Sequence, residues 1–385
     1  MTAEIPRRSI AVAGAFRFHV FELAAQLKRH GVLRHLTTAM PRRTVVELAP
    51  ESVRSHPQLA LVYHAWKRLG LPGDGAVHRQ FVRDFDRWCA RQLSDERLVV
   101  GLSSYSTASL AKAKELGMQA VCDRGSWHIV EQKRVLDEEA AKWGWDPEPF
   151  DPWLIERELA EYDTADLVTV PSEPARRSFL REGMAPERLA KAAYGVDIRK
   201  FHRSDARDRD HLRVICVGQI SLTKGHPYLL RAYRQVRRRG SSLALVGAAS
   251  RTAVSRLAIG ESDIEIHGRL TRDGVAAELR RSGVFALASP QEGLALVIGQ
   301  AMAAGLPIIA SEATGAEELI TDGVEGFIVP TGDEGRLAEA IERLLSDGDL
   351  AAAMGDAAWH KVQALGGWDR YGDDALAIYR QLLAR

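Results

Sequence analysis

The sequence has little cysteine. Cys89, Cys122 and Cys216 are spread over a chain of 385 residues. Their number is odd, their spacing is wide, and each lies in a mostly apolar or strand-like context, so neither a disulfide framework nor a zinc site is indicated. We expect three buried thiols in a reducing compartment, which fits a cytoplasmic protein.

Long apolar runs are also lacking. No stretch approaches the ~20 apolar residues that span a bilayer, and the opening segment MTAEIPRRSIAVAGAF has no long apolar stretch after its two arginines. We therefore expect neither a membrane span nor a signal peptide. The sequence has no tight cluster of His, Cys and carboxylates at metal-ligand spacing, and no Asp-any-Asp run placed to hold a metal-bound diphosphate. No metal site is expected.

Net charge is small, at +1, and 46% of the residues are hydrophobic, which excludes a mainly disordered chain. The charge is unevenly spread, because residues 1–100 hold 16 Lys and Arg against 9 Asp and Glu. Such a basic segment suits contact with an anionic membrane or a phosphorylated ligand, and it equally suits a solvated surface without a partner. Nucleic acid would explain only this segment, and we do not expect it as a partner.

Short apolar runs alternate with helical patterns in the first half of the chain. The expected strands are 9–14, 98–101, 120–122 and 167–170, and the expected helices include 20–30 and 107–116. This alternation predicts an α/β fold in which helices cover both faces of a parallel sheet.

The pattern restarts after a polar, charged stretch at 204–210 that suits a linker. The expected strands are then 212–218, 242–247, 264–267, 284–288, 307–310 and 326–329, and the expected helices are 227–238, 274–281, 297–304, 316–321 and 334–346. We predict two doubly wound, Rossmann-like domains. Ligands of such sheets bind at the carboxyl ends of the strands, so a site is expected in a cleft between the two.

The most informative segment runs from Ala288 to Ala310. Glu292 lies in a polar loop after an expected strand, and Gly293 beside it permits close backbone approach. Amides ahead of the helix that opens near Leu296 can face an anionic ligand. Gln300 follows Glu292 by eight positions, close enough for both to share one ligand.

This segment resembles the retaining glycosyltransferases of family 4, which have the GT-B fold. Their hallmark is a Glu, seven residues and a second Glu, inside a segment that ends in Ala-Met-Ala, a Gly and a Pro. The match covers about 35 residues, through 313–323 and 326–330, and a weaker likeness covers nearly the whole chain. The resemblance implies an acceptor-binding domain at 1–203, a donor-binding domain at 204–367, and a C-terminal helix at 368–385 that packs back on the first.

The resemblance also implies a donor site. Glu292 would contact the donor sugar, while Gln300 stands where the second family Glu holds the ribose hydroxyls. Because an amide accepts weaker hydrogen bonds than a carboxylate, Gln300 would hold the ribose more weakly than a Glu. The alternative, given equal weight, is that Gln300 is a solvent-facing helix residue that contacts no ligand. The predicted donor-binding residues are Gly218, Gln219, Lys224, Glu292, Gly293, Leu294, Ala295, Leu296 and Gln300.

The run from Val217 to Gly225 links an expected strand to a helix and contains glycines and a lysine, which is typical of a phosphate cradle. Lys224 matches a family cation on the donor pyrophosphate, whereas Gln219 replaces the family Arg. The negative charge on the departing diphosphate would then be less stabilised, unless Arg269 or Arg272 takes the place of the missing arginine beside it. A plain surface lysine is the alternative for Lys224.

Five further candidate residues belong to the first half. His128, shortly after strand 120–122, can reach the cleft, and the resemblance implies that it approaches the donor sugar and phosphate; a structural histidine is the alternative. Arg124 could bind phosphate or acceptor, or pair with Asp123 or Glu131. The loop after the first strand departs from the Gly-Gly turn of many relatives. The predicted acceptor-binding residues are Gly14, Arg17, His19 and Arg124.

Together with the lack of a metal motif, the resemblance thus implies a retaining, metal-independent, hexosyltransferase-type enzyme with Glu292, His128 and Lys224 as catalytic residues. It needs no cofactor beyond a nucleotide-diphosphate sugar as co-substrate. The acceptor is expected to be a glycan or lipid-linked hydroxyl in bacterial glycan, glycolipid or cell-envelope polysaccharide synthesis, with peripheral contact at the inner face of the membrane. Gln219 and Gln300 motivate the alternative of a catalytically weakened binding protein or partner subunit. An epimerase or a phosphorylase on the same fold is a third possibility.

Overall fold

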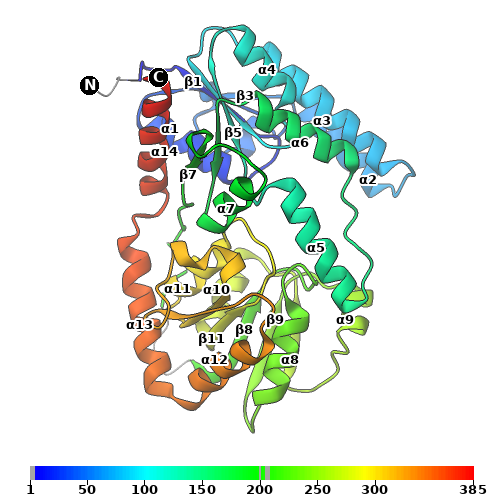
Figure 1. Cartoon of the computed structure of the whole chain (residues 1–385), viewed down its shortest axis with the longest axis vertical. Coiled ribbons are helices and arrows are strands. Elements are labelled where there is room, and N and C mark those ends of the chain that lie inside the picture. Colours follow the sequence, from blue (N-terminus) through cyan, green and yellow to red (C-terminus); the bar gives the residue numbers. More distant parts are fainter. Residues whose placement is uncertain (1–4, 199–200, 204–208) are drawn as a thin grey trace.

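The computed structural model describes residues 5–198, 201–203 and 209–385. Two halves, each built on one parallel sheet, lie one above the other along the long axis of the molecule (Figure 1). We call the unit around strands β1–β7 the first half and the unit around β8–β13 the second half. The predicted α/β class with two doubly wound sheets is confirmed.

The first sheet has seven described strands in the order β3-β2-β1-β4-β5-β6-β7, and all its pairings are parallel. Its strands are β1 Ile10–Ala13, β2 Leu33–Thr38, β3 Val53–Ser55, β4 Leu98–Leu102, β5 Gln119–Asp123, β6 Leu167–Val170 and β7 Leu189–Lys191. Its helices are α1 His19–Arg29, α2 Pro57–Arg68, α3 Asp74–Arg91, α4 Thr107–Glu115, α5 Ile129–Trp143, α6 Pro152–Thr164 and α7 Glu173–Arg181.

The second sheet has six described strands in the order β10-β9-β8-β11-β12-β13, again all parallel. Its strands are β8 Asp210–Val217, β9 Ser242–Val246, β10 Ile264–Gly268, β11 Ser282–Leu287, β12 Ile308–Ser311 and β13 Gly326–Val329. The remaining helices are α8 His226–Val236, α9 Arg251–Arg256, α10 Arg272–Arg281, α11 Leu296–Ala303, α12 Glu334–Ser346, α13 Gly348–Ala364 and α14 Gly367–Leu383.

Strands with continuous apolar runs are buried on both faces, as in β1, where all four residues are buried. The predicted strands 167–170 and 326–329 agree with β6 and β13 in both end residues. One expectation is wrong: 316–321 does not form an α-helix. The structure has only a single 3₁₀ turn at Ala316–Glu318, entered from Gly315 with φ of 74°.

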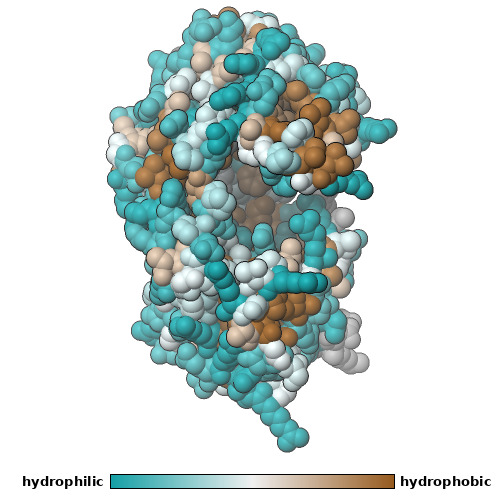
Figure 2. All heavy atoms as spheres, turned by 90° about the vertical axis from the view of Figure 1, so that its right-hand side faces the viewer, coloured by the Kyte–Doolittle hydropathy of each residue, from teal (hydrophilic) through white to brown (hydrophobic). Residues whose placement is uncertain are grey.

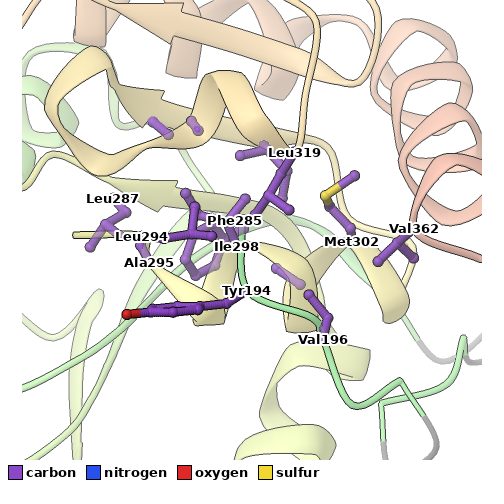
Figure 3. Close-up of a cluster of buried hydrophobic side chains, with 14 of the residues drawn as sticks. Tyr194, Val196, Phe285, Leu287, Leu294, Ala295, Ile298, Met302, Leu319 and Val362 are labelled. Atoms are coloured by element: carbon purple, nitrogen blue, oxygen red, sulfur yellow. The ribbon is translucent and has the colours of Figure 1, made fainter. Parts of the chain in front are cut away.

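The two halves are joined by more than the chain between them. Helix α14 packs on α1 of the first half, so the C-terminal helix returns to that half (Figure 1). Tyr194 and Val196, which follow β7, lie in one apolar cluster with Leu294 and Ile298 of the second half (Figure 3). The hydroxyl of Tyr228 in α8 donates to Glu139 of α5 over 2.5 Å.

The predicted domain boundary between 203 and 204 borders residues 204–208, which are outside the described residues, so it stays a prediction. The same holds for most of the predicted linker at 204–210. Its described part contains Arg209, whose guanidinium donates to the carbonyl oxygens of Gly305 and Ala304 over 2.7 Å each. Arg209 therefore fixes the entry to β8 against the turn after α11.

The three cysteines are free and buried, as predicted. Burial raises the pKa of the Cys216 thiol to about 12, so this group stays protonated and unreactive. Among the helices of the described residues, none is long and apolar enough to cross a membrane.

Candidate active site

A pocket of about 240 Å³ lies between the two halves, at the carboxyl ends of β5, β8 and β11. This is the position at which open parallel sheets bind ligands. Figure 2 shows the hollow between the upper and lower parts of the molecule. The pocket is lined by Gly125, Ser126, Gln132, Leu136 and Glu148 from the first half and by Thr223, Lys224, Gln291, Glu292 and Gly293 from the second.

Lys224 and Glu292 meet in this pocket. The ammonium of Lys224 forms an ion pair with Oε1 of Glu292, and Ser289 Oγ donates to the same carboxylate oxygen over 3.0 Å. Both side chains remain partly accessible, at 31% and 16% exposure. The structure thus places the predicted phosphate-binding cation and the predicted sugar-binding carboxylate against each other, open to solvent in the cleft.

The loop after β11 also touches the first half. Gln291 Nε2 donates to Ser126 Oγ over 2.8 Å, and a Cβ on Gly293 would overlap the carbonyl oxygen of Gly125. Ser172 Oγ donates to the carbonyl oxygen of Gly293. Gly293 therefore lies where the backbones of the two halves come close together, and its contact with a donor stays a prediction.

The amides of this loop depart in part from the expectation. The N–H of Glu292 donates to Ala313 O over 3.0 Å, and the N–H of Ala295 donates to Thr314 O over 3.1 Å. These two amides fix the loop on the segment after β12 and are not turned to the cleft. Any anion held by loop amides here must use other positions.

The loop after β8 brings Lys224 back toward its own strand. Gly225 has φ of 69° and no room for a Cβ, which would overlap Ala288 O at the end of β11. Gly218 lies against the aliphatic part of Lys224, with its Cβ position 3.5 Å from Lys224 Cδ. Gln219 is exposed, as are Arg269 and Arg272 after β10, and none of these three lines the pocket.

Four other predicted donor residues lie under and along α11. Leu294 and Ala295 are buried, and Figure 3 shows them beside Leu287 and Tyr194 in the apolar cluster. Leu296 begins α11 and is half-buried, as is Gln300 on the second turn of the helix. Leu294 and Ala295 thus support the loop from below, and ligand contact at Leu296 and Gln300 stays a prediction.

His128 does not line the pocket. Its ring is packed against Tyr162 and Phe179, with centroids 5.1 Å and 4.9 Å away, and its backbone N–H donates to Ser178 Oγ over 2.8 Å. Burial, with a smaller contribution from Arg124, lowers the pKa of His128 to about 4, so the ring is neutral near pH 7. The expectation that it reaches the cleft is therefore corrected: the aromatic neighbours hold its ring beside the entry to α5.

Arg124 is also engaged inside the first half. Its guanidinium pairs with Glu158 over 2.8 Å and donates to Gln132 Oε1 over 2.6 Å and to Trp127 O over 2.9 Å. Neither Asp123 nor Glu131, the partners considered from the sequence, is among these acceptors. The arginine fixes the 124–128 loop on α6, and the expectation that it faces phosphate or acceptor is corrected.

The loop after β1 holds the other predicted acceptor residues. His19 is buried and its Nε2 lies 2.9 Å from Asp123 Oδ2, with the ring stacked on Tyr194. Arg17 forms an ion pair with Glu47 and is 38% exposed. Gly14 packs against Val20, which leaves no room for a Cβ. Only Arg17 of these three presents a side chain to solvent, and an acceptor contact by it stays a prediction.

Sequence reasoning missed several pocket residues. Gln291 and Ser126 were given no role, although the adjacency of Gln291 to Glu292 could have indicated one. Gln132, Glu148 and Thr223 enter the pocket through the path of α5 and the loop after β8, which periodicity does not show. Among the described residues no group of three or more His, Cys, Asp or Glu side chains is placed to hold a metal ion.

Comparison with known proteins fits this geometry. Residues 211–347 match the family model described as glycosyl transferases group 1. The chain is 30% identical over 230 residues to a GDP-mannose-dependent alpha-(1-6)-phosphatidylinositol monomannoside mannosyltransferase of Mycobacterium tuberculosis, covering 54% of this chain and 60% of that protein. It is also 30% identical over 276 residues to the alpha-maltose-1-phosphate synthase of the same species, covering 62% of this chain and 71% of the relative. The chain thus spans about 60% of the length of the mannosyltransferase.

Solved structures resemble the whole fold. The sucrose-phosphate synthase from Thermosynechococcus elongatus gives a TM-score of 0.70 at 21% identity, over 98% of this chain and 100% of that one. Anabaena Alr3699/HepE, solved in complex with UDP and glucose, gives 0.67 at 17% identity, over 97% and 99% of the two chains. With two Rossmann-like sheets around one cleft and a relative matched over 71% of its length, the chain belongs to the group 1 glycosyl transferases and has the GT-B fold.

Proposed function

We propose that this chain is a retaining glycosyltransferase that moves a sugar from a nucleotide-diphosphate sugar to an acceptor hydroxyl without a metal ion. The observation that carries the proposal is the meeting of Lys224 and Glu292 in a pocket between the two sheets. A cation and a carboxylate at the carboxyl ends of neighbouring strands suit a ligand that combines a diphosphate with a sugar.

In the proposed reaction the bond between the anomeric carbon and the diphosphate oxygen breaks while the acceptor oxygen bonds to that carbon. The acceptor hydroxyl gives its proton to the departing diphosphate, and the nucleoside diphosphate leaves from the face that the acceptor enters. Lys224 would stabilise charge on the leaving diphosphate, and Glu292 would orient the sugar and favour positive charge at the anomeric carbon. His128, neutral and held by Tyr162 and Phe179, would support the loop beneath the sugar without touching it.

The acceptor belongs to the same proposal. One relative is named for transfer to a phosphatidylinositol mannoside and another for synthesis of maltose 1-phosphate. This range is consistent with a glycan or lipid-linked acceptor in bacterial envelope synthesis and with work at the inner face of a membrane. The acceptor would enter beside the β1 loop, where Arg17 is exposed.

A thermal-shift panel with UDP, GDP, ADP, CMP and dTDP, with EDTA present, tests the donor site. A ligand at ~100 times its dissociation constant stabilises the folded state by ~2.7 kcal/mol. We expect one diphosphate to raise the melting temperature and the Lys224→Ala variant to lose that rise, while Lys112→Ala, which removes an exposed lysine of α4 paired with Glu115, keeps it.

The competing candidate is a binding protein with a weakened donor site, favoured by Gln219 and Gln300 in place of family Arg and Glu. No stabilisation by any nucleotide at millimolar concentration would support that candidate. Stabilisation that appears only when Mg²⁺ replaces EDTA would contradict the metal-independent part of the proposal.

A further inference from the structure

Helix α2 presents an apolar stripe to solvent. Leu61, Val62 and Leu69 are 69%, 64% and 71% exposed. At 3.6 residues per turn, positions 61, 65, 69, 62 and 66 fall side by side within about 140° of the helix circumference. Leu61, Ala65, Leu69, Val62 and Trp66 therefore form one continuous surface, which we call the α2 stripe.

The α2 stripe is not needed by the core, because the opposite side of α2 already packs on α3. Ala60 is 7% exposed, and the ring of Tyr63 stacks on Phe81 of α3 with centroids 5.3 Å apart. Soluble monomers rarely leave a large apolar patch without a partner. Figure 2, which views the side of the molecule that carries α2 in Figure 1, shows apolar atoms gathered on its upper part with polar residues around them.

Exposed cations flank the α2 stripe at both ends. Arg42 and Arg43 line a groove of about 550 Å³ together with Pro57, the first residue of α2, and Lys67 and Arg68 are exposed at its end. Residues 41–72 hold five Lys and Arg against two Glu, and one of the two, Glu47, is already paired with Arg17. An apolar helix face bordered by cations is the pattern of helices that lie in a membrane interface.

Trp66 adds to this pattern. It is half-buried, and its indole N–H donates to Pro72 O over 3.1 Å. The bond fixes the ring at the edge of the stripe with its polar group satisfied. Tryptophan at such an edge is favoured at the depth of lipid headgroups, where one side of the ring meets acyl chains and the other meets water.

We propose that the α2 stripe docks on the surface of an anionic lipid bilayer, with its side chains at the boundary between headgroups and acyl chains and with Arg42, Arg43, Lys67 and Arg68 on headgroup phosphates. The inference rests on the proposed function only in that a bilayer would present a lipid-linked acceptor. A second copy of the chain is a poorer occupant, because a two-fold interface through the stripe would bring the same cations together.

The test is flotation of the full chain with vesicles, without nucleotide. Phosphatidylcholine vesicles with and without phosphatidylglycerol are compared at low and high salt, and we expect binding to the anionic vesicles that weakens as salt rises. The variant L61S/V62S/L69S should partition at least ~10-fold less into vesicles, because it removes the apolar contact. The control L116S/V324S changes two residues that are 42% and 49% exposed elsewhere and should bind as the wild type does.

The charge is tested by R42Q/R43Q, which should bind anionic vesicles at least ~5-fold more weakly and with a shallower salt dependence. The proposal is overturned if the wild-type chain floats with neither kind of vesicle. It is also overturned if the L61S/V62S/L69S variant keeps its melting temperature and floats as well as the wild type. A concentration-dependent dimer that this variant abolishes, while vesicle binding is absent throughout, would overturn it as well. Nucleotide-induced thermal shifts, measured on the same variants, report on the donor site separately, so either proposal can fail alone.

Discussion

Lys224 is paired with Glu292 in the free protein, so the cation expected to hold a diphosphate is already neutralised by the carboxylate expected to hold the sugar. A partly exposed ion pair is worth little, about 0–1 kcal/mol. A diphosphate with two negative charges can therefore displace the carboxylate from Lys224 and leave Glu292 free to meet the sugar. The pair keeps both side chains in place until the donor arrives.

Replacing Glu292 by Gln separates binding from turnover. We expect turnover to fall at least tenfold, equivalent to about 1.4 kcal/mol or more, because the charge that favours the developing cation is lost. Binding of the nucleoside diphosphate should stay as tight or become tighter, since Lys224 no longer has a competing carboxylate. Steady-state kinetics and calorimetric titration measure the two effects, and unchanged turnover would remove Glu292 from the proposed mechanism.

Restoring a carboxylate at position 300 should strengthen the donor site. A hydrogen bond to a charged group contributes ~1.5–3 kcal/mol, against ~0.5–1.5 for a neutral one, so Gln300→Glu should tighten nucleoside-diphosphate binding severalfold if the ribose lies there. Titration of the variant beside Gln219→Arg compares the two family positions. A nucleoside diphosphate that carries deoxyribose should bind Gln300→Glu with little or no gain in affinity. If the ribose and deoxyribose nucleotides both bind more tightly by the same factor, position 300 does not contact the ribose.

Adding a methyl group at Gly293 tests the contact between the halves. A Cβ there overlaps Gly125 O, whose backbone is held on the end of β5. We expect Gly293→Ala to lower stability by about 1–3 kcal/mol, as overpacking does, and to reduce activity by parting the halves. Chemical unfolding gives the first quantity, and Gly260→Ala, where a Cβ meets nothing within 4 Å, is the matched control.

The buried ion pair between Arg124 and Glu158 predicts a stability phenotype. Arg124→Met leaves the Glu158 carboxylate buried without its cation, which costs about 3–5 kcal/mol. Adding Glu158→Gln removes the unpaired charge, so the double variant should be more stable than Arg124→Met alone. Urea unfolding of all three variants measures this coupling. A fully stable Arg124→Met protein with poor acceptor affinity would restore the sequence-based role in acceptor binding.

Stability should rise between pH 5 and pH 7. Burial lowers the pKa of His35 to about 3 and those of His128 and His226 to about 4, from 6.5 in each case. In this window the unfolded chain binds protons that the folded chain does not, so acid favours unfolding. Burial raises the pKa of Glu161 to about 7, which acts in the opposite sense with a single group.

Urea unfolding at pH 5, 6 and 7 checks this sign. The His128→Phe variant should show a flatter pH dependence, since its aromatic neighbours accept a ring and one protonation step is removed. His360→Phe, in which an exposed ring is replaced, should keep the wild-type slope. A wild-type stability that falls from pH 5 to pH 7 would contradict the prediction.

The arrangement of the donor loops was predictable because parallel strands bring their carboxyl ends to one edge. Lys224 and Glu292 are distant in sequence, yet each follows one of two neighbouring strands, β8 and β11, and both strands have clear apolar runs. Strand β2 was missed because its sequence Leu-Arg-His-Leu-Thr-Thr is not uniformly apolar. Thr37 and Thr38 are nevertheless buried there, and their hydroxyls donate to the carbonyl oxygens of Val12 and Ala15.

The misplaced roles of His128 and Arg124 have a common cause. Both follow a correctly predicted strand, but their directions are set by partners on helices that the sequence patterns did not identify. Glu158 and Tyr162 come from α6, and Phe179 comes from α7. A position after a strand therefore predicts the neighbourhood of a side chain, whereas its orientation depends on packing between distant elements.

The return of α14 to the first half determines how the cleft can open. The chain passes between the halves twice, and the two passages touch: a Cβ on Gly195 would overlap the backbone of Trp368, and the Cβ position of Gly367 lies 3.3 Å from Val196 O. Two adjacent passages define one line through the molecule. We therefore expect the cleft to open mainly by a clamshell rotation of the two halves about that line.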